Sequence, residues 1–228
     1  EGTDREFSWR FNIITDLSQP FNRYKFNFLF EDIDGDNDLD FLCDCSNAWY
    51  KNDGQGDFNE SFVIDDRFGP AAYAADIDQN GKMNVVTAGS YDVVIYEYQS
   101  DVSWTSDTLG RIDFNRSRYF PFHERTEVFD MHNDGDLDIV YSGMELFHQG
   151  FLLIFEQKED GYVLNTQFSI EGDGMDFSIV DYDNDGFTDI VTGVKYTSPM
   201  ESYDFSGNDN IVVFKNQNGT FSEEIILE

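Results

Sequence analysis

Short apolar runs recur along this chain, and none shows the spacing of a helix. Each is only a few residues long, is rich in Val, Ile, Phe and Tyr, and is bounded by Gly, Asn, Asp or Ser. Runs of this kind predict β-strands joined by turns. Aromatic residues make up 17% of the sequence, which also favours strands over helices. We therefore expect an all-β chain.

The runs repeat in a fixed order, which we label A, B, C and D. Expected A strands cover 28–30, 73–75, 128–129 and 179–180; B strands 39–42, 83–86, 137–140 and 188–191; C strands 48–50, 93–96, 151–155 and 211–214; D strands 58–64, 102–109, 162–170 and 221–227. The repeating units cover approximately 21–69, 70–118, 119–170 and 171–228. Units of about fifty residues with four strands each are typical of β-propeller blades. The fold we expect is a single β-propeller domain of four-stranded blades over residues 1–228.

An extra strand is predicted before the first unit. Residues 1–20 contain Phe7, Trp9, Phe11 and Ile13, which alternate as in a strand. This strand leaves the chain with four A-B-C sets and five D-like strands. The chain is then either a closed four-blade ring with an extra edge strand, or an arc of a larger propeller. Because natural proteins avoid a bare apolar edge strand, we expect the surplus strand to close the ring or to pair with another chain.

Strands A and B are joined in every unit by a polar nonapeptide. The copies are DIDGDNDLD at 32–40, DIDQNGKMN at 76–84, DMHNDGDLD at 130–138 and DYDNDGFTD at 181–189. Acidic or amide residues occupy positions 1, 3, 5 and 9, with His132 as the exception, and position 6 is glycine in three copies. Clustered oxygen ligands on a tight loop suit Ca²⁺, and glycine allows the positive φ that such a loop needs. An EF-hand is excluded because position 12 is never glutamate.

Strand, Asp-x-Asp-x-Asp-Gly-x-x-Asp, strand resembles the FG-GAP/VCBS repeat, which builds the β-propellers of integrin α subunits and of many secreted proteins. Phe68-Gly69, followed by AADID at 74–78, is similar to the FG-GAP form. The segments KNDGQGDF at 51–58 and KNQNGTF at 215–221 resemble the Asn-x-Gly-x-Gly-x-Phe turn of VCBS repeats. The resemblance covers nearly the whole chain. It implies a calcium-binding propeller, secreted or at the cell surface.

The resemblance also implies which residues hold the metal. Side chains at positions 1, 3, 5 and 9 and the backbone carbonyl at position 7 would be ligands of up to four Ca²⁺. The candidates are Asp32, Asp34, Asp36, Asp38 and Asp40; Asp76, Asp78, Asn80, Lys82 and Asn84; Asp130, His132, Asp134, Asp136 and Asp138; and Asp181, Asp183, Asp185, Phe187 and Asp189. We expect the strongest sites in units 1 and 4. Imidazole is a poor calcium ligand, which weakens unit 3, and unit 2 is weakest because it has two fewer charges and a lysine at position 7.

Charge narrows the range of partners. Fourteen Lys and Arg stand against 46 Asp and Glu, for a formal net charge of −32. A chain so acidic is not expected to bind nucleic acid or to insert into a membrane, and no apolar run approaches the length of a membrane span. Fifteen of the acids are aspartates of the nonapeptides. Cys43 and Cys45 are two residues apart and would share one face of a strand; buried thiols, a strained local disulfide and a thiol pair for another chain stay open.

No catalytic motif stands out. The histidines are His123, His132 and His148, and no nucleophile, P-loop or HExxH pattern is present. The function we expect is recognition of a protein or glycan ligand. One alternative is a structural subunit of an extracellular assembly. Another is a catalytic or non-catalytic propeller part of a secreted polysaccharide-active enzyme.

Overall fold

The described chain is built entirely from β-strands in four antiparallel sheets. The structure, a computed structural model, describes residues 28–43, 48–65, 73–89, 92–111, 125–145, 149–171, 176–195 and 209–227. Each sheet is a four-stranded meander, in which every strand pairs with its neighbours in sequence. The strands are β1 (Phe28–Glu31), β2 (Asp40–Cys43), β3 (Ala48–Lys51) and β4 (Glu60–Val63); β5 (Tyr73–Ala75), β6 (Asn84–Gly89), β7 (Asp92–Ser100) and β8 (Ser103–Arg111); β9 (Arg125–Phe129), β10 (Asp138–Glu145), β11 (Gln149–Lys158) and β12 (Gly161–Glu171); and β13 (Phe177–Val180), β14 (Asp189–Lys195), β15 (Asp209–Gln217) and β16 (Thr220–Leu227).

All sixteen strands expected for the four units are present, so the all-β prediction is confirmed. One sheet corresponds to each predicted unit, and we call the sheets and their loops units 1 to 4. The differences lie at the strand ends. For example, β7 and β11 extend beyond the predicted apolar runs because polar residues continue the ladder of each hairpin.

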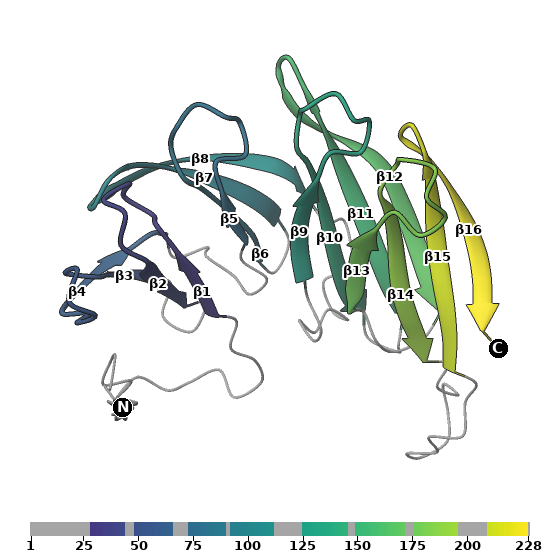
Figure 1. Ribbon diagram of the computed structural model, residues 1–228, viewed down its shortest axis with the longest axis horizontal. Helices are drawn as coiled ribbons and strands as arrows, with labels where there is room; N and C mark the ends of the chain where they lie inside the picture. Colours follow the sequence, from purple (N-terminus) through teal and green to yellow (C-terminus); the bar gives the residue numbers. More distant parts are fainter. Residues whose placement is uncertain are drawn as a thin grey trace, which may run out of the picture.

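The sheets follow one another in an arc (Figure 1). Adjacent first strands contact each other, β1 with β5 and β5 with β9, and the outer strands β8 and β12 also meet. Units 1 and 4 lie at opposite ends of the arc in this view. In the described residues no apolar cluster joins these two units, so the four sheets do not form the closed four-blade ring that was one of the two alternatives.

The apolar core lies between neighbouring sheets. One cluster joins units 1 and 2 around Trp49 and Tyr96, a second joins units 2 and 3 around Phe155, and a third joins units 3 and 4 around Phe214. Successive strand residues face opposite neighbours because side chains alternate across a sheet. In unit 3, for example, Ile139 packs toward unit 2 while Val140 packs toward unit 4. Each inner sheet is therefore apolar on both faces.

Several sequence predictions fall outside the described residues. They include the strand over residues 1–20, the Phe68-Gly69 motif and Cys45. Cys43 is the last residue of β2. Across the described part of the chain, no helix has the length and apolar character needed to cross a membrane.

Candidate metal centres

Each nonapeptide forms the loop between the first and second strands of its sheet. Loop 1 is residues 32–40, loop 2 is 76–84, loop 3 is 130–138 and loop 4 is 181–189. Two residues of each loop have a positive φ. At position 4 these are Gly35, Gln79, Asn133 and Asn184, and at position 6 they are Asn37, Gly81, Gly135 and Gly186. The requirement at position 6 matches the sequence prediction, but position 4 was not foreseen. The asparagines and the glycine at position 4 could have indicated it, because these residues tolerate a positive φ better than most.

The acidic residue at position 1 organises the turn. In loop 4, Asp181 accepts backbone N–H groups of Asp185 and Gly186, each at 3.1 Å. Asp130 makes the equivalent pair of bonds in loop 3. Asp32 in loop 1 accepts the N–H of position 6 as well, but its second donor is the N–H of Gly35 at position 4. The residue at position 5 in turn accepts the N–H of position 7, at 2.9–3.1 Å in all four loops. Backbone donors therefore hold these side-chain oxygens toward the inside of the loop.

The residue at position 9 begins the second strand and links the loop to the chain at the third strand, an arrangement that we call the clamp. In loop 4, the buried carboxylate of Asp189 accepts the N–H of Tyr182 and the N–H of Asn216, both at 2.8 Å. The first bond closes the loop, and the second ties it to the third strand. Asp40 and Asp138 are buried and make the same two kinds of bond.

Loop 2 has an amide at position 9, and the clamp changes accordingly. Asn84 is also buried, and its Oδ1 accepts the N–H of Ile77 at 2.8 Å. Its NH₂ group cannot accept the donor from the third strand. That donor, the N–H of Tyr98, instead reaches the carbonyl of Met83 at 2.9 Å. Asn84 thus keeps the loop closed without supplying a charge.

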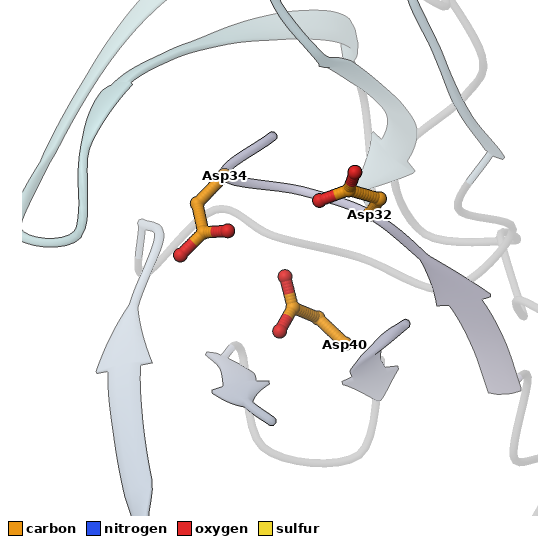
Figure 2. A group of neighbouring side chains, drawn as sticks. All are labelled: Asp32, Asp34 and Asp40. Atoms are coloured by element: carbon orange, nitrogen blue, oxygen red, sulfur yellow. The ribbon is translucent and has the colours of Figure 1, made fainter. Parts of the chain in front are cut away.

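Loop 1 brings three carboxylates to one point. Asp32, Asp34 and Asp40 each place an oxygen within 4.8 Å of the others, and Figure 2 shows the three groups around a common space. Burial raises the pKa of Asp40 to about 6, against the opposing effect of its two backbone donors. The Lys51 ammonium is hydrogen-bonded to Asp34, which raises the lysine pKa, and it lies 3.5 Å from Asp36. One lysine leaves this group of acids strongly negative.

Loop 4 forms the second group. Asp181, Asp183 and Asp185 converge within the same 4.8 Å limit. Lys215 Nζ lies 3.6 Å from Asp183 and 2.6 Å from Glu224, and its hydrogen bond with Glu224 raises the lysine pKa. The two groups use different members of the predicted sets: positions 1, 3 and 9 in loop 1, and positions 1, 3 and 5 in loop 4.

Loops 2 and 3 do not converge in this way. Within the described residues, no three acidic or histidine side chains of either loop meet the 4.8 Å limit. In loop 2, Lys82 Nζ lies 3.0 Å from Glu97, and Asn80 donates to both Asp78 and Glu97. The carboxylates of Asp78 and Glu97 therefore already accept hydrogen bonds from side chains of the same unit. In loop 3, His132 Nε2 lies 3.3 Å from Glu156, and its Nδ1 lies 3.9 Å from Asp138.

A residue on the third strand accompanies each loop, and sequence reasoning missed its role. It is Glu97 in unit 2, which pairs with position 9, and Lys51, Glu156 or Lys215 in the other units, where the register continued by one residue places it opposite position 9. A lysine accompanies the loops with acids at positions 1, 3, 5 and 9, whereas a glutamate accompanies the loops that contain Lys82 or His132. The sequence does contain a signal for this role, which is the lysine before asparagine at the start of both the 51–58 and the 215–221 segments. Each of these lysines contacts the carboxylate at position 3 of its loop.

Neighbouring loops are also joined to each other. The side-chain amide of Gln79 in loop 2 donates to the carbonyl of Gly135 in loop 3. Asn133 in loop 3 donates to the carbonyl of Gly186 in loop 4 at 2.6 Å. In both pairs, position 4 of one loop contacts position 6 of the next. Loop 1 has Gly35 at position 4 and offers no such amide.

The donor sets suit a hard divalent cation. Two oxygens on opposite sides of one Ca²⁺ lie about 5 Å apart, which matches the 4.8 Å grouping in loops 1 and 4. Loop 2 keeps one feature of a ligand site, because Oδ1 of Asp76 is buried and has no hydrogen-bond partner. A cation would provide the partner that this oxygen lacks. Oxygen-only donors on a tight loop favour Ca²⁺ over softer metals.

A scan against models of known protein families finds none that matches this chain, and no curated protein is similar to it.

Proposed function

We propose that the chain is a calcium-stabilised arc of a β-propeller of the FG-GAP/VCBS type. It acts outside the cell as a binding module for a protein or a glycan. The observation that carries the proposal is the convergence of three carboxylates in loop 1 and of three in loop 4. Such groups repel one another unless a cation neutralises them, and the loop backbone already holds them in place.

The repeated geometry supports the same proposal. The four loops share positive φ at positions 4 and 6, and three of them share the clamp from a position 9 aspartate. The loops connect first and second strands, so they gather at equivalent places along the arc. The sheets supply a rigid frame, and function in such folds is carried by loops on that frame. This arrangement and the acidic surface support the proposed ligand-binding role.

Calcium binding is tested by thermal melts of metal-stripped protein with and without Ca²⁺. One filled site stabilises the folded chain by about 2.7 kcal/mol at a hundredfold excess over Kd. We expect occupancy to decrease from loops 1 and 4 to loop 3 and then to loop 2, which anomalous scattering at limiting Ca²⁺ resolves. Equal melting midpoints contradict the proposal, and a filled loop 2 beside an empty loop 4 contradicts the ranking.

Ligand binding needs a separate assay. A glycan array and a panel of extracellular matrix proteins, each probed with Ca²⁺ and with chelator, report calcium-dependent recognition. Binding that disappears in chelator supports a module whose ligand surface depends on the loops. Calcium-dependent stability without binding to any of these ligands favours the alternative role as a structural subunit.

A further inference from the structure

Position 4 of one loop and position 6 of the next form a contact that repeats between neighbouring units, and we call it a loop joint. At the joint of loops 2 and 3, the side-chain amide of Gln79 donates to the Gly135 carbonyl. At the joint of loops 3 and 4, the amide of Asn133 donates to the Gly186 carbonyl at 2.6 Å. A carboxamide of the chain therefore occupies each of these two joints.

The joint of loops 1 and 2 lacks this group. Position 4 of loop 1 is Gly35, which has no side chain. Position 6 of loop 2 is Gly81, and no side chain in the described part of the chain donates to its carbonyl. The loop turns in the same way as its equivalents, because φ is 86° at Gly81, against 94° and 93° at Gly135 and Gly186. This joint therefore has the acceptor but not the donor.

A cavity of about 390 Å³ lies at the same joint. Gly35 and Gly81 both line it, together with acids of the two loops, Lys82 of loop 2 and Tyr98 of β7. A volume of this size is within the range of small-ligand sites. Gly35 and Gly81 are exposed, and a Cβ added to Gly35 would meet no atom within 4 Å. The place that a side chain fills at the other joints is therefore open to a ligand group from solvent.

The lining carries both signs of charge. Asp32, Asp34 and Asp76 contribute carboxylates, which would repel a carboxylate ligand. Asp34 is already hydrogen-bonded to Lys51, and the Lys82 ammonium in the lining would repel a second cation. A carboxamide is neutral, and it carries both N–H donors and a C=O acceptor. It is also the group that this chain places at its other two joints.

We propose that the cavity between loops 1 and 2 is a recognition site for a carboxamide, the side chain of asparagine or glutamine in a partner protein. The ligand NH₂ group donates to the Gly81 carbonyl, as Gln79 and Asn133 do at the other joints. The Lys82 ammonium, which lines the same cavity, donates to the ligand C=O. The proposal rests on the ligand-binding role proposed above and names the chemistry of the ligand. It does not need bound calcium, because the contacts use a backbone carbonyl and a lysine.

A chemical-shift titration of the isotope-labelled chain tests the site, with N-acetylglutamine methylamide as the probe. The backbone amide signals of Gly35, Gly81 and Lys82 should move and saturate, in Ca²⁺ and in chelator alike. The corresponding glutamate and lysine derivatives should bind more than about tenfold more weakly, because each of them meets a like charge in the lining.

Gly35→Asn supplies the missing group from the chain itself. Asparagine tolerates the positive φ of this position, and its amide should donate to Gly81 as Asn133 does to Gly186. Probe binding should weaken more than about tenfold, because the cavity is then filled. Gly56→Asn is the matched control, since φ there is 86° and an added Cβ also meets no atom within 4 Å. The control should bind the probe like wild type and should melt below Gly35→Asn, which gains a hydrogen bond.

Three results would overturn the proposal. One is the absence of saturating shifts at the three signals, and another is a folded Gly35→Asn variant that binds the probe like wild type. The third is a glutamate or lysine derivative that binds as tightly as the glutamine derivative. Calcium melts report on the proposed function separately. Stabilisation by Ca²⁺ without probe binding overturns the carboxamide site alone, and probe binding without stabilisation by Ca²⁺ overturns the calcium proposal alone.

Discussion

Replacing Asp189 with asparagine separates the two roles of position 9. The buried carboxylate of Asp189 accepts the N–H groups of Tyr182 and Asn216, both at 2.8 Å. Asparagine can keep the first bond, as Asn84 does in loop 2. It places its own NH₂ group against the second donor. The Asn216 N–H then loses a charged acceptor and remains buried.

The size of the effect follows from that lost bond. A hydrogen bond to a charged group contributes about 1.5–3 kcal/mol, and an unsatisfied buried donor costs about 1–3 kcal/mol. We therefore expect Asp189→Asn to lower the free energy of unfolding in chelator by about 2–4 kcal/mol. For a chain of this length the melting midpoint should fall by about 4–16 °C. The assay is a thermal melt followed by circular dichroism.

Asp183→Asn is the matched control. The Asp183 carboxylate is partly exposed, and its described contact is with Lys215 at 3.6 Å. This variant should melt like wild type in chelator but lose part of the stabilisation by Ca²⁺. Asp189→Asn should be less stable than wild type both in chelator and in Ca²⁺. A change under about 0.5 kcal/mol for Asp189→Asn in chelator, which is no more than a typical surface substitution gives, refutes the clamp.

Three further predictions concern pH, loop contacts and packing. In metal-stripped protein, burial keeps Asp40 protonated up to about pH 6, so the free energy of unfolding should fall as pH rises from about 4 to about 6. Urea unfolding at a series of pH values measures this fall. The same pH dependence in the Asp40→Asn variant would contradict the prediction. Asn133→Gly, which accepts the positive φ of this position, removes the hydrogen bond to the Gly186 carbonyl and should cost about 0.5–1.5 kcal/mol in chelator. An unchanged melt would show that the contact contributes nothing. Gly143→Ala places a methyl group against the buried ring of Phe151 and should cost about 1–3 kcal/mol; denaturant unfolding checks this, and a cost near zero would mean that the ring moves freely.

The fold was largely predictable from the sequence because two local signals agree. Apolar runs of strand length recur in a fixed order, and a loop pattern with two turn-forming positions separates the first two strands of each unit. Ring closure was not predictable. It depends on the angle between neighbouring sheets, which arises from side chains such as Trp49 and Phe155 between units, and no local pattern encodes that angle.

The residues of the candidate site were predictable, but their hydrogen bonds and charged neighbours were not. The spacing of acids in residues 32–40 and 181–189 predicts converging oxygens, and three carboxylates converge in each of these loops. The sequence could not show that Asp40 and Asp189 also accept backbone N–H groups from the end of the third strand or the residue after it, because these donors lie 12 and 27 residues away. The opposing charges of Lys51 and Glu97 depend on register across two strands, which is likewise a long-range property.

The position 9 clamps lie within single units, whereas apolar burial joins neighbouring units, and this difference has a consequence for how the chain folds. The clamps from Asp40, Asp138 and Asp189 close within single units, whereas the three largest apolar clusters each span two. An excised unit would keep its backbone bonds but bury little apolar surface. The smallest cooperative folding element is therefore a pair of neighbouring units, and stability grows by nearest-neighbour interfaces as in other repeat arrays. Opening should start at units 1 and 4, so backbone amides in β6 and β10 should exchange with solvent most slowly.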